Sequence, residues 1–171
     1  MSSSIWPVLF AIFCLLVITS DFRKRRISNQ LLLAALLVHA GFLLANTFVP
    51  EVLALPATLS WRQCITGFLM GLLVFFPFWG LKLLGAGDVK LIATLGFLLG
   101  FAGLWQVVLV ATVLTGLHAV LTVLAQGWLS ARASWWNESK EKRRGVPYGA
   151  WLAVTALAWV GTVYWSGYAW F

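Results

Sequence analysis

Residues 91–131 are LIATLGFLLGFAGLWQVVLVATVLTGLHAVLTVLAQGWLSA, without a single Asp, Glu, Lys or Arg. This stretch is 41 residues long, whereas a helix needs about 20 apolar residues to cross a bilayer. Because it is about twice the length of one span, we expect it to fold back on itself inside the membrane. Gly100, Gly103 and Gln106 mark the expected turn, since glycine interrupts helical patterns.

The rest of the chain is similarly apolar. Hydrophobic residues make up 61% of the 171 positions and charged residues only 10%, with a mean hydropathy of +0.91. Further spans are expected at residues 5–20, 31–49 and 63–81, and from 147 toward 171. No Lys or Arg precedes Ile5, so we expect the first span to remain as a helix and not to be cleaved as a signal peptide. The sequence predicts an all-α polytopic membrane protein, a bundle of about six helices forming one domain over residues 1–171.

Basic residues predict the orientation of this bundle. Eleven of the twelve Lys and Arg residues fall on one face, at 23–26, at 82 and 90, and between 132 and 144, and only Arg62 falls on the other. Loops rich in Lys and Arg stay in the cytoplasm, so both termini are expected to face outward. Loops of this kind, in contact with anionic membrane lipid, account for the net charge of +7 without a role in nucleic-acid binding. An aromatic belt is expected at the far end of the last span, from Tyr164, Trp165, Tyr168 and Trp170.

The Cys and His residues do not indicate a cofactor. Cys14 and Cys64 lie in or beside apolar segments and form no CxxC pair, so neither a zinc site nor a disulfide framework is predicted. His39 and His118 each lie alone in an apolar run, where packing or a helix–helix hydrogen bond is favoured over metal binding. We therefore expect no metal and no cofactor.

The chain has only two aspartates, Asp21 and Asp88, each where an apolar segment meets a basic one. A carboxylate at membrane depth is costly, by about 2.5 to 3.5 kcal/mol at a helix centre, and usually has a function. Two nearby carboxylates share one proton, so that one accepts a proton from attacking water and the other donates to a carbonyl oxygen. Taken singly, each aspartate also fits a simple capping or helix-end residue.

The residues around Asp88 suggest how it is held. Gly85 and Gly87 are expected to let the backbone adopt positive φ and let a peptide substrate approach closely. Lys90 either turns back toward Asp88 or, as we favour, extends to the lipid headgroups. Which aspartate is the acid and which the base is left open.

Three blocks in order resemble the type IV prepilin peptidases, and in particular their short Tad-type members that serve Flp pili. They are Asp21 with Arg26-Ile27-Ser28-Asn29, then Gly85-Ala86-Gly87-Asp88-Val89-Lys90-Leu91, then Val146-Pro147-Tyr148-Gly149. The resemblance covers essentially the whole chain. It implies a GxGD aspartic membrane protease of the bacterial inner membrane, with Asp21 and Asp88 as the catalytic pair. The residues that it implies in support are Asn29, Gly85, Gly87, Lys90, Pro147, Tyr148 and Gly149.

The resemblance also implies the substrates and partners. They would be prepilins and pilin-like proteins whose basic leader is cut after a glycine on the cytoplasmic side, with the pilus assembly machinery as a further partner. The basic residues at 23–26, Lys90, and Arg143 or Arg144 would attract the glutamate that follows the cut. The identity of the pilin and the oligomeric state are left open, as is the order of the loop at 132–145.

Two departures from the family pattern stand out. Ser28 occupies a position where the family often has proline, which would loosen the start of the second helix without removing chemistry. Long family members carry a cytoplasmic insertion with paired CxxC motifs and also methylate the new N-terminus, but this chain has no such insertion. We therefore predict peptidase activity without N-methyltransferase activity.

Three alternative functions fit parts of the pattern. A presenilin-like intramembrane protease also uses Gly-x-Gly-Asp, but its first aspartate typically follows a tyrosine, and here Ser20 precedes Asp21. A proton-coupled transporter also has membrane carboxylates, but no internal repeat or pair of broken helices is evident. A noncatalytic assembly factor would tolerate the loss of either aspartate's acidity.

Overall fold

The computed structural model describes residues 5–24, 27–48, 59–132 and 147–166. All regular secondary structure in these ranges is helical, which confirms the all-α prediction. Four of the helices are long and apolar enough to cross a membrane, and the apolar stretch Tyr148–Val163 lies on the fifth. The five helices are α1 (Ile5–Lys24), α2 (Asn29–Phe48), α3 (Trp61–Gly80), α4 (Ala86–Arg132) and α5 (Tyr148–Ser166).

Several predictions from the sequence lie outside the described residues. These are the positions of the two chain ends, the loop at 133–146 with most of its basic cluster, and the aromatic residues Tyr168 and Trp170. The side chains of residues 164–166 are likewise not described. The outward orientation of the termini and the aromatic belt therefore stay predictions.

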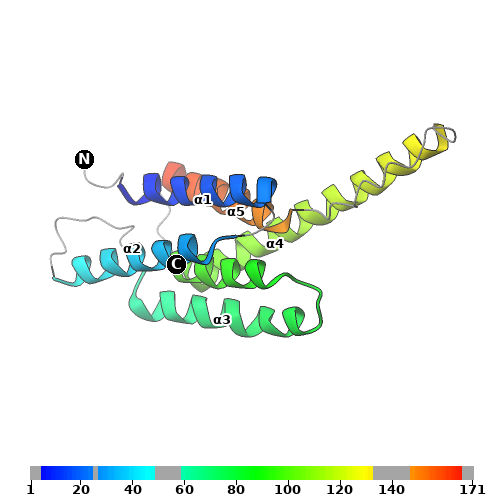
Figure 1. Ribbon diagram of the computed structural model, residues 1–171. Helices are drawn as coiled ribbons and strands as arrows, with labels where there is room; N and C mark the ends of the chain where they lie inside the picture. Colours follow the sequence, from blue (N-terminus) through cyan, green and yellow to red (C-terminus); the bar gives the residue numbers. More distant parts are fainter. Residues whose placement is uncertain (1–4, 25–26, 49–58, 133–146, 167–171) are drawn as a thin grey trace.

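The fold-back expected between residues 91 and 131 lies within α4. Gly100, with φ 69° and ψ 177°, is not helical and divides the 47-residue element into a first arm (86–99) and a second arm (101–132). The Cδ2 atom of Leu104 is 3.1 Å from where a Cβ on Gly96 would lie. In a straight helix, residues eight apart are about 12 Å apart along the axis. The chain therefore turns back at Gly100, as Figure 1 shows, and Gly100 is one of the residues predicted to mark the turn.

Gly100 makes this turn because it has no side chain. Backbone with positive φ and extended ψ is essentially restricted to glycine. A Cβ at this position would also lie 2.8 Å from the Cδ2 atom of Leu59, which precedes α3. The turn therefore packs directly against the start of α3. That start is fixed by a capping box, in which Ser60 and Gln63 bond each other's backbone N–H.

The first arm packs tightly against α3 at a pair of glycines. A Cβ added to Gly67 would overlap the carbonyl oxygen of Gly96, and a Cβ added to Gly96 would overlap that of Gly67. The two backbones are therefore in direct contact, as small residues allow in membrane helix pairs. This contact sets the position of the first arm, which carries Asp88 at its start.

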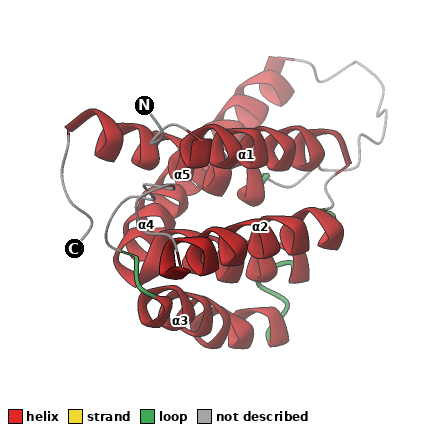
Figure 2. Ribbon diagram, turned by 90° about the vertical axis from the view of Figure 1, so that its left-hand side faces the viewer, coloured by secondary structure: helices red, strands yellow, loops and turns green. Residues whose placement is uncertain are grey.

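The second arm packs antiparallel to α5. Gly103 meets the Trp159 ring, and Thr112 lies beside Tyr148, so residue numbers rise along one helix as they fall along the other. In both views, α1 and α5 lie on one side of the bundle and α3 on the other, with α2 between them (Figures 1 and 2). This arrangement brings the beginning of α5, the end of α1 and the beginning of α4 to one end of the bundle.

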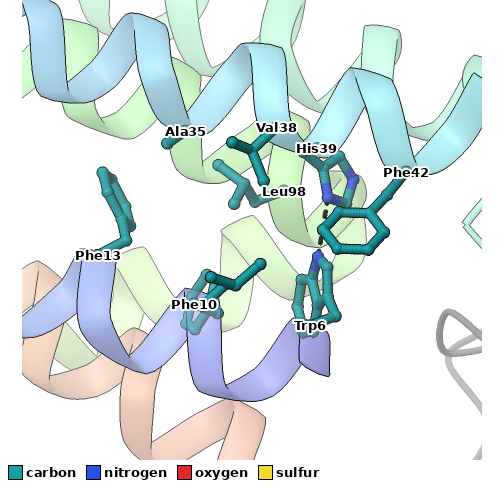
Figure 3. Close-up of a pocket in the computed structure, with 9 residues that line it drawn as sticks. Trp6, Phe10, Phe13, Ala35, Val38, His39, Phe42 and Leu98 are labelled. Atoms are coloured by element: carbon teal, nitrogen blue, oxygen red, sulfur yellow. Dashed lines mark hydrogen bonds between the residues drawn. The ribbon is translucent and has the colours of Figure 1, made fainter. Parts of the chain in front are cut away.

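His39 connects three helices away from that end. The indole N–H of Trp6 on α1 donates to His39 Nδ1 at 2.9 Å, and the Sγ atom of Cys64 on α3 is 3.7 Å from His39 Nε2. Figure 3 shows Trp6 and His39 beside a cavity of about 40 Å³ between α1 and α2. The predicted role of His39 in a helix–helix hydrogen bond is confirmed. His118 packs edge-on against the Trp151 ring.

Candidate active site

The two aspartates come together at the end of the bundle where α1 ends and α4 begins. Asp21 is 7% exposed, and Asp88 is partly buried in the first turn of α4. A Cβ built on Gly149 would lie 3.1 Å from Asp21 Oδ2 and 3.2 Å from Asp88 Oδ1. The two oxygens are therefore no farther apart than the sum of these distances. Residues 67 positions apart in sequence form one carboxylate pair.

Asp21 is held by the beginning of α5. Its Oδ2 atom accepts the backbone N–H of Ala150 at 2.7 Å. Ala150 lies in the first turn of α5, where N–H groups have no partner within the helix and the helix dipole favours negative charge. This bond fixes the orientation of the Asp21 carboxylate. It also connects α1 to α5 at the level of the pair.

Asp88 is held by the turn that precedes α4. Its backbone N–H donates to Gly85 O at 3.1 Å, and the N–H of Val89 donates to the same oxygen at 3.2 Å. A Cβ on Gly85 would come within 3.0 Å of Asp88 Oδ2. Gly85 is therefore small because the carboxylate of Asp88 folds back beside it.

The expectation of positive φ at Gly85 and Gly87 was wrong. Among the described glycines, only Gly100 has positive φ, and Gly87 lies inside the helical first turn of α4. A Cβ on Gly87 would be in ordinary contact, 3.8 Å from the Cβ of Ile27. Close packing around the Asp88 carboxylate, and not unusual backbone conformation, accounts for the glycine at position 85.

The other predicted residues lie at the starts of α2, α4 and α5, and among them Gly149 lies beside both carboxylates. The Lys90 ammonium donates to Asn29 Oδ1 at 3.1 Å, so it connects the start of α2 to α4 and does not turn back to Asp88. The Pro147 carbonyl accepts the N–H of Trp151 at 3.4 Å as α5 begins. Gly149 is buried directly between the two carboxylates.

Three residues at the site were missed from the sequence. Ala150 acts through its backbone N–H, which no residue type reveals. Ile27 packs against Gly149, with its Cδ1 atom 3.0 Å from where a Cβ on Gly149 would lie. The hydroxyl of Thr112 is 3.2 Å from the hydroxyl of Tyr148. Thr112 is one of four threonines in the apolar run 91–131, so the sequence did not single it out.

The arrangement is suited to acid/base chemistry on a neutral substrate. In the described part of the chain, no group of three His, Cys, Asp or Glu side chains converges as a metal site would require. The site offers two carboxylates that each place one oxygen beside Gly149, and a backbone N–H donor that bonds one of them. Such a pair can take one proton and give another in the same step.

Residues 8–120 match the family described as the type IV leader peptidase family. The chain belongs to the type IV leader peptidase family. The match covers more than half of the chain and includes both Asp21 and Asp88. The family resemblance found in the sequence motifs is therefore confirmed.

One relative gives a second measure of this membership. The chain is 30% identical over 159 residues to a protein named prepilin leader peptidase/N-methyltransferase from Pectobacterium carotovorum subsp. carotovorum. The alignment covers 88% of this chain and 49% of that protein, so the chain spans about half the length of the relative. No solved structure matches the chain significantly.

Proposed function

We propose that this protein is a prepilin leader peptidase of the aspartic type, in which Asp21 and Asp88 together activate water. The observation that carries the proposal is the convergence of one oxygen from each carboxylate on the position of Gly149, at 3.1 and 3.2 Å. Membership of a peptidase family supports the reaction class. Two carboxylates this close together supply a mechanism for it.

The reaction proceeds through one proton shared by the pair. The ionised carboxylate removes a proton from water as its oxygen attacks the scissile carbonyl carbon, while the protonated carboxyl group donates its proton to the carbonyl oxygen. The tetrahedral intermediate then collapses and the C–N bond breaks. The leaving nitrogen takes the proton that the first carboxylate removed from water, and the hydroxyl formed from the carbonyl oxygen returns its proton to the second carboxylate, so the pair again holds one proton. The Ala150 N–H holds Asp21 in place throughout.

The substrates in this proposal are Flp-type prepilins and pilin-like proteins. The excess of Lys and Arg on one face supports a cytoplasmic location for the end of the bundle that carries the pair. A six-span arrangement, with the two arms of α4 as separate spans, gives this location and outward termini. A basic leader would be cut after a glycine at the cytoplasmic face of the inner membrane, where the pilus assembly machinery takes up the product.

We further propose that the chain cleaves without methylating. Its sequence has no paired CxxC motifs between the spans, which in long members of the resembled family accompany methyl transfer. The name of the longer relative includes N-methyltransferase, so this difference is open to a direct test. The mass of the new pilin N-terminus after cleavage by this protein alone should carry no added methyl group.

The test is cleavage of co-expressed candidate prepilins, measured by a shift on a gel and by N-terminal sequencing. Asp21→Asn and Asp88→Asn should each abolish a cut after glycine while remaining in the membrane at wild-type levels. Arg62→Gln, an exposed charge change at the start of α3, is the matched control and should cleave normally. A cut within the transmembrane segment of the substrate would instead indicate a presenilin-like protease. No cut by the wild type, with proton-dependent uptake into liposomes, would indicate a transporter.

A further inference from the structure

A groove between α2, α3 and the first arm of α4 lies beside the carboxylate pair without being part of it. Its cavity has a volume of about 330 Å³. Asn29 on α2 and Lys90 on α4, both exposed, form its mouth. Lys90 follows Asp88 by two residues. Buried Leu32 and Ala93 form its floor. We call this the α2–α4 groove.

The mouth of the groove is built from hydrogen-bond donors. The Lys90 ammonium donates one N–H to Asn29 Oδ1 at 3.1 Å, and an ammonium has three donors. That bond also directs the side-chain amide of Asn29, whose NH₂ group adds two more donors. Asn29 is the first residue of α2, a 20-residue helix whose N-terminal end favours negative charge. A group with several acceptor oxygens and a negative charge matches this mouth.

The walls beyond the mouth are apolar. On α2, the lining continues to Leu36, two turns or about 10 Å from Asn29. Phe68 lines the opposite side from α3. The Thr94 hydroxyl, the one polar group deeper in the groove, donates to the Lys90 carbonyl at 2.9 Å.

These walls fit a hydrocarbon chain better than an extended peptide. Each peptide residue brings an N–H and a C=O that need partners in an apolar setting. The groove walls are helices whose backbone groups are already bonded internally, so they offer few hydrogen-bond partners to a peptide. An acyl chain needs no hydrogen-bond partner. Basic pockets between membrane helices on the cytoplasmic side are a general signature of anionic lipid recognition.

We propose that the α2–α4 groove binds one anionic glycerophospholipid, with its phosphate at Lys90 and Asn29 and one acyl chain along Leu36 and Phe68. The occupant is a resident of the membrane in which the bundle sits. The proposal does not depend on the proposed peptidase activity, because it concerns binding alone.

The experiment uses the whole purified protein in a neutral detergent after its lipids have been removed. Native mass spectrometry measures the binding of phosphatidylglycerol and of phosphatidylcholine with the same acyl chains. Glycerol 3-phosphate serves as the probe for a free headgroup. The wild type should bind one phosphatidylglycerol at least tenfold more tightly than phosphatidylcholine, and glycerol 3-phosphate should not compete at equal concentration.

Four variants separate the two parts of the groove. Lys90→Gln should remove the preference for phosphatidylglycerol, whereas Lys82→Gln, an exposed lysine in the turn before α4, should keep it. Leu36→Trp should weaken the binding of both lipids at least fivefold, because the larger side chain fills the groove. Leu37→Trp, on the exposed side of α2, should leave the binding of both lipids unchanged. Melting temperatures without lipid verify that each variant is folded, and Lys90→Arg should retain the preference if Lys90→Gln does not fold.

Three results would overturn the proposal. The first is an unchanged preference for phosphatidylglycerol in folded Lys90→Gln. The second is full competition by glycerol 3-phosphate, which would assign the mouth to a free anion. The third is normal binding of both lipids by folded Leu36→Trp, which would place the acyl chain outside the groove. Loss of cleavage in the aspartate variants has no bearing on any of these outcomes.

Discussion

Replacing Gly149 with alanine tests the geometry of the carboxylate pair with a single methyl group. The new Cβ would lie 3.0 Å from Ile27 Cδ1, 3.1 Å from Asp21 Oδ2 and 3.2 Å from Asp88 Oδ1, whereas ordinary contact begins at 3.4 Å. Each neighbour must therefore move away by a few tenths of an ångström. Catalytic groups must be held within about 0.5 Å of their productive positions, and a displacement of about 1 Å costs roughly 100-fold in rate. Moves of a few tenths of an ångström at both carboxylates add up to about half of that 1 Å displacement, so we expect kcat/KM to fall by about 10-fold.

The stability of the Gly149→Ala variant should change much less than its activity. Overpacking costs about 1 to 3 kcal/mol, but alanine is better than glycine in a helix by about 1 kcal/mol, which offsets part of that cost. Gly161→Ala is the matched control on the same helix, because nothing lies within 4 Å of its added Cβ. The assay measures initial cleavage rates at several prepilin concentrations beside thermal melting in detergent. A folded Gly149→Ala variant that cleaves at the wild-type rate would refute the geometry of the pair.

Three further substitutions test the fold that positions the pair, each by thermal melting in detergent. Gly96→Ala should destabilise the protein by about 1 to 3 kcal/mol because its Cβ would overlap the backbone of α3. Gly41→Ala is the control, because the space around it is open. Equal stability of the two variants would contradict the α3–α4 contact. His39→Leu should cost about 1 kcal/mol by removing the hydrogen bond between the Trp6 indole and His39 Nδ1, and an unchanged melting temperature would show that this bond contributes nothing. Gly100→Ala should cost about 1 to 3 kcal/mol because alanine strains the positive-φ turn, and a fully stable variant would argue against a reversal at this residue.

The sequence predicted the parts of this protein that depend on residue type. A span of double length without charge predicted a reversal, and the glycine at position 100 is where the helix breaks. Two rare carboxylates in an apolar chain predicted a pair, and Asp21 and Asp88 do meet. Both predictions follow from the high cost of charge and of unpaired backbone groups in a membrane.

What the sequence could not predict depends on three-dimensional packing. The Ala150 N–H that holds Asp21 is a backbone group 129 residues away and carries no sequence signal. Lys90 and Asn29 are 61 residues apart, so their bond follows only from the packing of α2 against α4. Positive φ was expected at Gly85 from residue type alone, but the space beside Asp88 is what limits its side chain. Glycine is compatible with either cause, and only the folded structure distinguishes them.

The central claim is that Asp21 and Asp88 act as one catalytic unit, and a double-mutant cycle tests it most directly. Cleavage rates of one prepilin are measured for the wild type, Asp21→Asn, Asp88→Asn and the double variant, at equal amounts of folded protein. Residues that act as a unit are strongly non-additive, so either single substitution should reduce the rate as far as the double substitution does. Substantial cleavage by either single variant, or a double variant whose loss is the product of two partial losses, would contradict the shared mechanism.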